Sequence, residues 1–421
     1  MGTLFLAHAE VPAEAPGEEV RVQIDWQAHP AMHIPWKMFG RGLTHRELRR
    51  RTWRHQLRQT VSQPTLGGSE VRIFLAAAMA AERARNPRQA RRLILKQLKY
   101  VEDFADENSD DYAIATSPAE ARALLSTTKK MVIIHSIEGG HHLLWQPDDA
   151  QFWADQGVAL VTLIHLRDRE LGGADILEGG LGPVVNRWGT RAARKGERRG
   201  LTDLGKASIV ALDAAGILVD YAHMSPASLE DALQVSAAHQ IPPVLTHNSL
   251  DRVRRGEFSI TDAQLVEIYR LGGVFSVALT AGKLTEEAAT GPAPEGMCWQ
   301  TLEAWAWQHN TVQQTILDNV GTIFGDPELD AEELTEAQWT RLATGWSSDW
   351  NGWVSHSLPV HGRKRCRPER EDMLDIDTRG LAHPGLLPEH WQRVAELEVD
   401  FEPMLRSSER FLQLWAEARG E

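Results

Sequence analysis

The sequence predicts an α/β protein, namely a (β/α)8 TIM barrel with helical insertions. Two observations carry this prediction. Short apolar runs, typical of parallel strands buried on both faces, recur along the chain, and helical patterns lie between them. Eight such runs can be counted, and unbroken β–α alternation with eight strands is the arrangement of a closed barrel. An open, doubly wound sheet is the alternative that the same alternation allows.

The expected strands are spread over most of the chain. They are Val20–Trp26, Val71–Met79, Met131–Ile137, Ala159–Ile164, Ile217–Ala222, Val244–Thr246, Val274–Leu279 and Leu342–Ser347. The alanine-rich end of the second run, Ala76–Ala81, is equally compatible with a helix.

Two of the intervening helices have clear end signals. One begins at the Thr202-Asp203 cap and stops at Gly216, and another opens on the capping box Thr261–Gln264 and ends at Gly272. Three longer segments interrupt the pattern. They are His29–Gly68, expected to be partly helical, Arg167–Arg199, expected to form a loop over the barrel mouth, and Gly282–Arg341, expected to be mostly helical.

Composition limits the classes of function. The chain has 421 residues and a formal net charge of −13, which argues against nucleic-acid binding. No linker divides it, so we expect an N-terminal extension over residues 1–19 and one domain over residues 20–421. Neither a signal peptide nor a membrane span is recognisable, so the expected location is the cytoplasm. Cys298 and Cys366 are expected to be incidental thiols in a reducing compartment.

The most informative residues stand where the expected strands end. His223 and His247 each close a short apolar run, and a helical stretch separates the two runs. Because the carboxyl ends of parallel strands open into one shared mouth, we expect the two imidazoles to meet there. Neutral imidazole is the commonest protein ligand of zinc and related metals, and Glu138 closes a third run. A strand-end histidine can also simply cap a loop, but two of them with a carboxylate favour a metal.

Further strand ends supply groups for catalysis. Asp25, Gln27 and His29 follow the first run, His165 the fourth, and Asp349 the eighth. A carboxylate such as Glu138 can bridge two metals roughly 3.5–4 Å apart, as in two-metal hydrolytic sites. A water between them becomes a nucleophile, and Asp349 is expected to accept its proton and deliver it to the leaving amine.

At this point the sequence resembles the membrane (renal) dipeptidase family of the amidohydrolase superfamily, as an atypical bacterial-type member. The matching motifs run in order from about Val20 to the C-terminus. They are Ser136-Ile-Glu138-Gly-Gly, Gly200-Leu-Thr-Asp-Leu-Gly-Lys, Val219-Asp-Tyr-Ala-His223-Met-Ser, Val244-Leu-Thr-His247-Asn-Ser and Ser348-Asp349-Trp-Asn-Gly. The resemblance implies a zinc-dependent barrel, usually dimeric, that cleaves dipeptides, often with a D-residue at the second position.

The resemblance also implies a role for each matching residue. Glu138 would be the bridging ligand, and His223 and His247 would hold the second metal. His165 would contact the scissile carbonyl or its oxyanion. Arg254 would clamp the substrate carboxylate as a bidentate fork, and Asp349 would be the acid/base.

One departure from the family pattern affects the first metal. The first strand of the family normally ends with a His-x-Asp or a His-x-His pair, whereas here Gln27 stands in the first position and His29 in the second. An amide oxygen is a poor zinc ligand beside an imidazole. His33 would compensate only if its loop turns back, and Asp25 is a further candidate. We therefore expect one firmly bound Zn²⁺ and a weak second one.

The expected function is a metal-dependent hydrolase, a peptidase that cleaves the amide bond of a dipeptide or a similar small carboxylate-bearing amide. Its expected partners are the small-molecule substrate and a second copy of the chain. Binding to nucleic acid or to a membrane is not expected. Two alternatives remain. One is another amidohydrolase activity, on an N-acyl amino acid or a lactone, and the other is a catalytically silent member that has lost its first histidine at Gln27.

Overall fold

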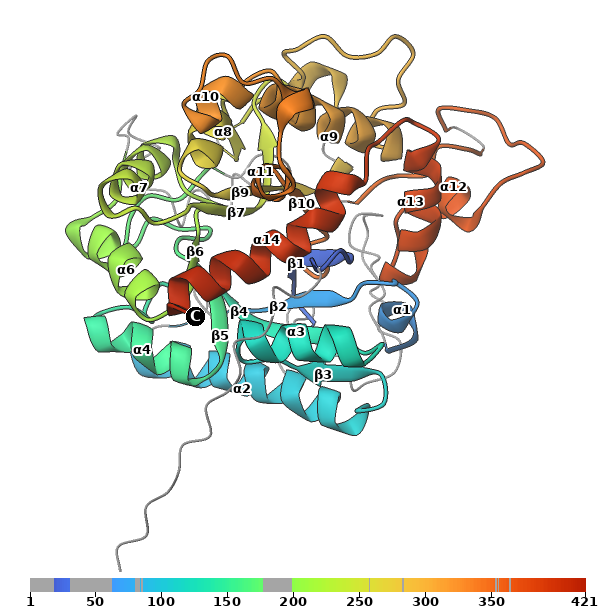
Figure 1. Cartoon of the computed structure of the whole chain (residues 1–421). Helices are drawn as coiled ribbons and strands as arrows, with labels where there is room; N and C mark the ends of the chain where they lie inside the picture. The colour runs from blue at the N-terminus through green and yellow to red at the C-terminus, as the bar shows by residue number, and fades with distance from the viewer. Residues whose placement is uncertain are drawn as a thin grey trace, which may run out of the picture.

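The structure, a computed structural model, describes residues 19–30, 63–79, 84, 86–176, 199–256, 258–281, 284–352, 354, 356–362 and 365–421 (Figure 1). The strands within these ranges are β1 (Ile24–Ala28), β2 (Ile73–Met79), β3 (Tyr112–Ile114), β4 (Met131–Glu138), β5 (Val158–Thr162), β6 (Leu218–Asp220), β7 (Val244–Leu250), β8 (Ser259–Ile260), β9 (Val274–Ala278) and β10 (Thr344–Ser347).

Eight of these strands form a closed parallel barrel. Their order is β2-β1-β10-β9-β7-β6-β5-β4, and β4 pairs with β2 to close the ring. All the pairings are parallel, so every strand in the ring brings its carboxyl end to the same mouth. The predicted (β/α)8 barrel is therefore confirmed, and the open doubly wound sheet is wrong.

Helices surround the barrel. They are α1 (Gln63–Gly67), α2 (Pro87–Glu107), α3 (Pro118–Thr127), α4 (Pro147–Asp155), α6 (Asp203–Ala214), α7 (Pro226–His239), α8 (Asp262–Arg270), α9 (Leu302–Leu317), α10 (Val320–Phe324), α11 (Glu336–Arg341), α12 (Asp375–Arg379), α13 (Leu387–Ala395) and α14 (Glu402–Arg419), with short 3-10 turns at Glu286–Ala288, Ala331–Glu333 and Pro384–Leu386. None of the described helices has both the length and the apolar character that a membrane crossing needs.

The helix ends follow from local chemistry. The Thr202 side chain accepts a hydrogen bond from the Gly205 N–H at the start of α6, as the sequence predicts. At the start of α8, Thr261 and Gln264 form the predicted reciprocal capping box. Both helices thereby satisfy backbone donors that would otherwise lack a partner, which fixes where each helix follows its strand.

The C-terminal helix α14 seals the barrel at the end opposite the mouth. It crosses the strands in Figure 1 and packs against β1, β6 and β10. Phe411 and Trp415 of α14 join the same buried apolar cluster as Trp26, Ile134 and other inward-facing strand residues. The Ser408 hydroxyl accepts a hydrogen bond from the Val22 N–H, which ties α14 to the chain just before β1. The site must therefore open at the other end.

Strand boundaries differ from the predicted ones at both ends. β1 begins at Ile24 rather than at Val20, and β5 and β6 each end two residues before the predicted end. β1 extends beyond Trp26 to Ala28, and β7 extends beyond Thr246 to Leu250. The alanine-rich run Ala76–Ala81 is strand up to Met79, so the helical interpretation of this run is wrong there. Two short strands were missed. β3 pairs with the first half of β4, and β8 pairs with the end of β7.

The prediction for the cysteines is wrong. Cys298 and Cys366 form a disulfide across a sequence separation of 68 residues. The bond joins the segment that follows β9 to the segment that follows β10. Sequence spacing gave no signal for it, because two cysteines this far apart meet only through the tertiary fold. Disulfides of this kind persist in oxidising compartments, so the cysteines do not support a reducing one.

Candidate active site

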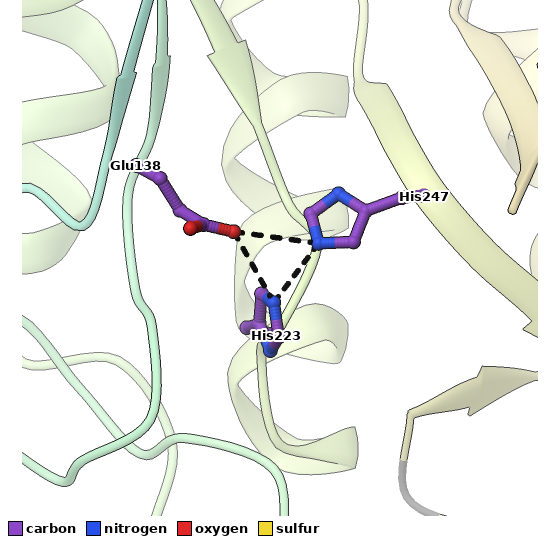
Figure 2. A group of neighbouring side chains, drawn as sticks. All are labelled: Glu138, His223 and His247. Atoms are coloured by element: carbon purple, nitrogen blue, oxygen red, sulfur yellow. Dashed lines mark hydrogen bonds and ion pairs between the residues drawn. The ribbon is translucent and has the colours of Figure 1, made fainter. Parts of the chain in front are cut away.

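Three buried side chains meet at the barrel mouth (Figure 2). Glu138 ends β4, His223 follows β6, and His247 lies within β7. The Nε2 atoms of His223 and His247 are each 3.4 Å from Glu138 Oε1 and 2.9 Å from one another. Among the described residues, this is the one group of three or more histidine, cysteine, aspartate or glutamate side chains whose possible ligand atoms all lie within 4.8 Å of one another. The structure thus brings together the three residues that the strand ends predicted.

The other oxygen of Glu138 faces a second set of residues. His29 Nε2 lies 3.0 Å from Glu138 Oε2 and 3.3 Å from Asp349 Oδ1. His165 Nε2 is 3.5 Å from the same Glu138 oxygen, and its ring packs edge-on against the ring of His223. Glu138 therefore lies between two sets of groups, with one oxygen directed to each. This is the geometry that a bridging carboxylate requires.

Hydrogen bonds on the far side of each imidazole determine which ring nitrogen faces Glu138. His29 Nδ1 lies 3.1 Å from the carbonyl oxygen of Ala77, which only accepts, so Nδ1 carries the proton. The Thr246 hydroxyl donates to the buried Asp220 carboxylate at 2.8 Å, so it accepts from His247 Nδ1 at 2.7 Å. In both rings Nδ1 donates on the far side, and Nε2 is the nitrogen that faces Glu138. A histidine that binds a metal through Nε2 does so as the neutral imidazole.

The third imidazole follows the same rule. His223 Nδ1 faces the Asp175 carboxylate at 3.4 Å, and a carboxylate likewise only accepts. Three Nε2 atoms and one carboxylate therefore converge. This donor set suits zinc and related divalent metals, and the far-side acceptors are those that metal-ligating histidines usually have. The residues present fit a metal ion.

The pKa values of the site residues are strongly shifted from their ordinary values. Burial alone would raise the pKa of Glu138, but the imidazoles of His165 and His29 hold it well below the usual range. Burial lowers the pKa of His223, but hydrogen bonds from this ring to Asp175 and Glu138 outweigh it and raise the pKa to about 10. Burial and the neighbouring His223 lower the pKa of His247 to about 4. Glu138 is thus an anion, the form in which a carboxylate binds a metal.

Two site residues have left-handed backbone conformations. His223 has φ +63° and Asp349 has φ +50°, which is uncommon for residues other than glycine and clusters at functional sites. The Asp349 N–H donates to the carbonyl of Gln27 at 2.7 Å, which holds the turn after β10 onto β1. Gly352 is required nearby, because a Cβ there would lie 1.7 Å from Asp349 Oδ1.

Arg254 is buried and lies near the histidine pair through an aromatic neighbour. The Phe258 ring lies 4.9 Å from the ring of His223 and 5.6 Å from the ring of His247, centroid to centroid. The Arg254 guanidinium carbon lies 5.9 Å from the Phe258 centroid. The sequence did not point to Phe258, because it lies in a loop with no strand or helix pattern.

The candidates at the end of β1 have different surroundings. Gln27 is buried, and its Nε2 is 3.4 Å from His29 Nε2, so it lies beside the second set of groups, the one that contains His29. Asp25 accepts hydrogen bonds from the backbone N–H and the hydroxyl of Ser348 and joins β1 to the turn after β10. Burial raises the pKa of Asp25 to about 7. His33 lies outside the described residues.

Solved structures share the fold. An amidohydrolase from Pseudomonas aeruginosa aligns with 95% of this chain and 97% of its own at 13% identity and a TM-score of 0.60. The probable dipeptidase PvdM from the same organism aligns with 95% and 96% at 17% identity and a TM-score of 0.57. A metallopeptidase from Rhodobacter sphaeroides, solved with a phosphinate mimic of the dipeptide L-Ala-D-Ala, aligns with 84% and 89% at 14% identity and a TM-score of 0.59.

Sequence comparison identifies the family. An uncharacterised dipeptidase from Schizosaccharomyces pombe is 24% identical over 184 residues, which are 44% of this chain and 40% of that protein. The chain thus matches about two fifths of the length of this curated relative. The sequence model of the membrane dipeptidases, peptidase family M19, matches residues 33–324, a range that contains Glu138, His223 and His247. The chain belongs to the membrane dipeptidase family, M19.

Proposed function

We propose that this chain is a metal-dependent hydrolase that cleaves the amide bond of a dipeptide with a free carboxylate. The observation that carries the proposal is the placement of Glu138 between His29 and the His223–His247 pair, with one oxygen directed to each side. Family membership and the dipeptide mimic bound by the Rhodobacter sphaeroides relative favour a dipeptide as substrate.

This placement supports two metal positions. Glu138, His223 and His247 would hold one Zn²⁺ firmly, and His29 with the other Glu138 oxygen would hold a second one weakly beside Gln27. When bound, zinc supplies Lewis acidity, which favours ionisation of water to a nucleophile near neutral pH.

The remaining residues have separate tasks in this proposal. Asp349, buried and 3.3 Å from His29, would take the proton of the attacking water and pass it to the leaving amine. His165 would donate a hydrogen bond to the oxygen of the scissile carbonyl as negative charge develops there. Arg254 would pair with the substrate carboxylate at the wall that Phe258 forms beside the histidine pair.

One further proposal concerns the assembly of the enzyme. On the resemblance to the family, we propose that the chain acts as a homodimer on small molecules. The cytoplasmic location expected from the sequence has lost the support of the cysteines, because the Cys298–Cys366 disulfide is typical of an oxidising compartment.

A substrate panel with the variant Arg254→Leu tests the substrate class. We expect turnover of dipeptides in the presence of Zn²⁺, and a fall in kcat/KM of about 10–100-fold in the variant, because a charge-assisted pair with the substrate carboxylate is lost. The panel contains L-L and L-D dipeptides, N-acyl amino acids and a lactone. Arg255→Leu is the matched control, since Arg255 is the next residue and is exposed.

The panel also separates the alternatives. Turnover of the lactone or N-acyl substrates alone, or an Arg254→Leu variant as active on dipeptides as the control, would rule out the dipeptidase proposal. If nothing is hydrolysed and no zinc is bound, the chain is a silent member of the family.

The variant Gln27→His tests why the metal on the His29 side of Glu138 should bind weakly. Gln27 lies 3.4 Å from His29, so a histidine there adds an imidazole ligand where the structure has an amide. We expect the Zn²⁺ content to rise toward two per chain and kcat to increase. Metal analysis after dialysis measures the first effect, and Gln27→Asn, which keeps the amide, is the control. An unchanged zinc content would contradict this explanation.

A further inference from the structure

Asp175 is a buried carboxylate outside the set of expected metal and substrate ligands. It lies in the loop after β5, and its side chain is fully buried. Its Oδ1 lies 3.4 Å from His223 Nδ1, on the side of the ring opposite Glu138. Among the residues that the structure describes, His223 is the one basic side chain within 4.0 Å of this carboxylate.

The loop around Asp175 is fixed to the loop that carries His223. The Asp175 N–H donates to the His223 carbonyl at 2.9 Å, and Ala174 bridges with Met224 in an antiparallel pair. The same residue whose ring meets the carboxylate is thus also held through its backbone. His223 needs such support because its backbone has φ +63°, a conformation that a surrounding structure must impose.

Further contacts join the loop around Asp175 to the start of α7. The Gly173 carbonyl accepts hydrogen bonds from the Ser225 N–H at 3.0 Å and the Ser228 hydroxyl at 2.8 Å, at the start of α7. Gly173 has no room for a side chain, because a Cβ there would lie 2.2 Å from the carbonyl oxygen of Arg199. The loop therefore fits closely, and the place of the Asp175 side chain is determined before any ligand arrives.

The two histidines of the pair are supported in different ways. The His247 ring is held by the neutral Thr246 hydroxyl, which in turn donates a hydrogen bond to Asp220. The His223 ring faces a carboxylate directly. A direct anionic acceptor fixes the tautomer and makes the opposite ring nitrogen a stronger electron donor to a metal, more so than a neutral hydroxyl does.

We propose that Asp175 is a positioning residue that orients His223 Nε2 toward Glu138 and so sets the affinity of this half of the site for its metal. The inference rests on the proposed metal-dependent function. Asp175 faces the nitrogen of the His223 ring that is opposite Glu138. It acts through the imidazole, and the loop after β5 thereby becomes part of the metal site.

Zinc titration of purified variants tests the role. Removal of an outer-shell partner typically weakens metal binding by about 10–100-fold, so we expect Asp175→Ala to weaken the tightest Zn²⁺ site by this factor. Asp175→Asn keeps an acceptor oxygen and should lose less, which is the rescue that a positioning role predicts. Competition with a chromophoric chelator measures the affinity, and the visible spectrum of the Co²⁺-loaded proteins reports a changed ligand geometry.

The matched control is Asp168→Asn in the same loop. Asp168 Oδ1 accepts from the Ala174 N–H, and asparagine keeps that acceptor while removing the same charge. We expect the control to stay within about twofold of the wild type, and excess Zn²⁺ to restore the activity of the Asp175 variants. This span is well below the loss expected at Asp175.

The outcomes separate this inference from the proposed function. If the wild type binds zinc tightly and Asp175→Ala binds it as well as the control does, the positioning role is wrong and the metal-dependent function stands. If the wild type binds no zinc, the proposed function itself fails. Should Asp175→Ala not fold, as judged by circular dichroism, the isosteric Asp175→Asn decides: an affinity equal to that of the control overturns the inference, and a weaker one supports it.

Discussion

Replacing Glu138 with glutamine is expected to remove metal binding and activity together. The carboxylate faces His29 with one oxygen and the His223–His247 pair with the other, so the change takes the anionic ligand from both halves of the site. We expect zinc affinity to fall by more than about 100-fold, since even the loss of an outer-shell partner costs about 10–100-fold. Zinc titration and dipeptide turnover measure the two effects.

The same substitution at a glutamate outside the site, Glu102→Gln, provides the control. Glu102 of α2 lies 3.5 Å from His135, which is on β4 with Glu138, but at a position away from the site. Glu102→Gln therefore removes a carboxylate from a histidine contact without touching the mouth of the barrel, and both zinc affinity and turnover should be unchanged. A Glu138→Gln protein that still bound zinc like this control would show that Glu138 is not a ligand.

The variant Asp349→Asn should separate proton transfer from metal binding. Glu138, His223 and His247 all remain in place, so zinc content should stay near that of the wild type. We expect kcat to fall by about 10²–10⁴-fold, the contribution that a positioned general acid–base usually makes. Asparagine tolerates the left-handed backbone that Asp349 has at φ +50°, so the turn should persist.

Steady-state kinetics with saturating zinc measures this effect. Asp372→Asn makes the same change at a side chain that is 73% exposed, in the segment after β10, and should leave kcat unaltered. A kcat in Asp349→Asn within about tenfold of the control would assign the proton transfer to another group, because it falls short of the usual contribution.

The barrel and the centre of the site could be predicted from the sequence for one physical reason. Strands buried on both faces leave long apolar runs, and the residues that close each run must lie at the mouth. Glu138, His223 and His247 were found in this way. The same rule misplaced strand ends, because the polar Gln27 and the stretch after Thr246 are still strand, although they do not look apolar.

The parts that could not be predicted depend on contacts between distant segments. Asp175 lies in a glycine-rich loop with no periodicity, and its meaning appears only where that loop meets His223, 48 residues later. Phe258 likewise has no local signal. Cys298 and Cys366 pair because two mouth-side segments run side by side, which their spacing does not encode.

The seal made by α14 has a consequence for how the chain is synthesised. A ribosome completes all eight barrel strands before residues 402–419 exist, so until then Phe411 and Trp415 are missing from the inner apolar cluster. Until α14 is synthesised, the apolar interior of the barrel stays exposed at one end, and exposed apolar surface promotes aggregation. The hydrogen bond from the Val20 N–H to the Glu409 carboxylate likewise cannot form until Glu409 has been synthesised, hundreds of residues after Val20. Truncation within α14 should therefore yield insoluble protein, although every residue of the active site is present.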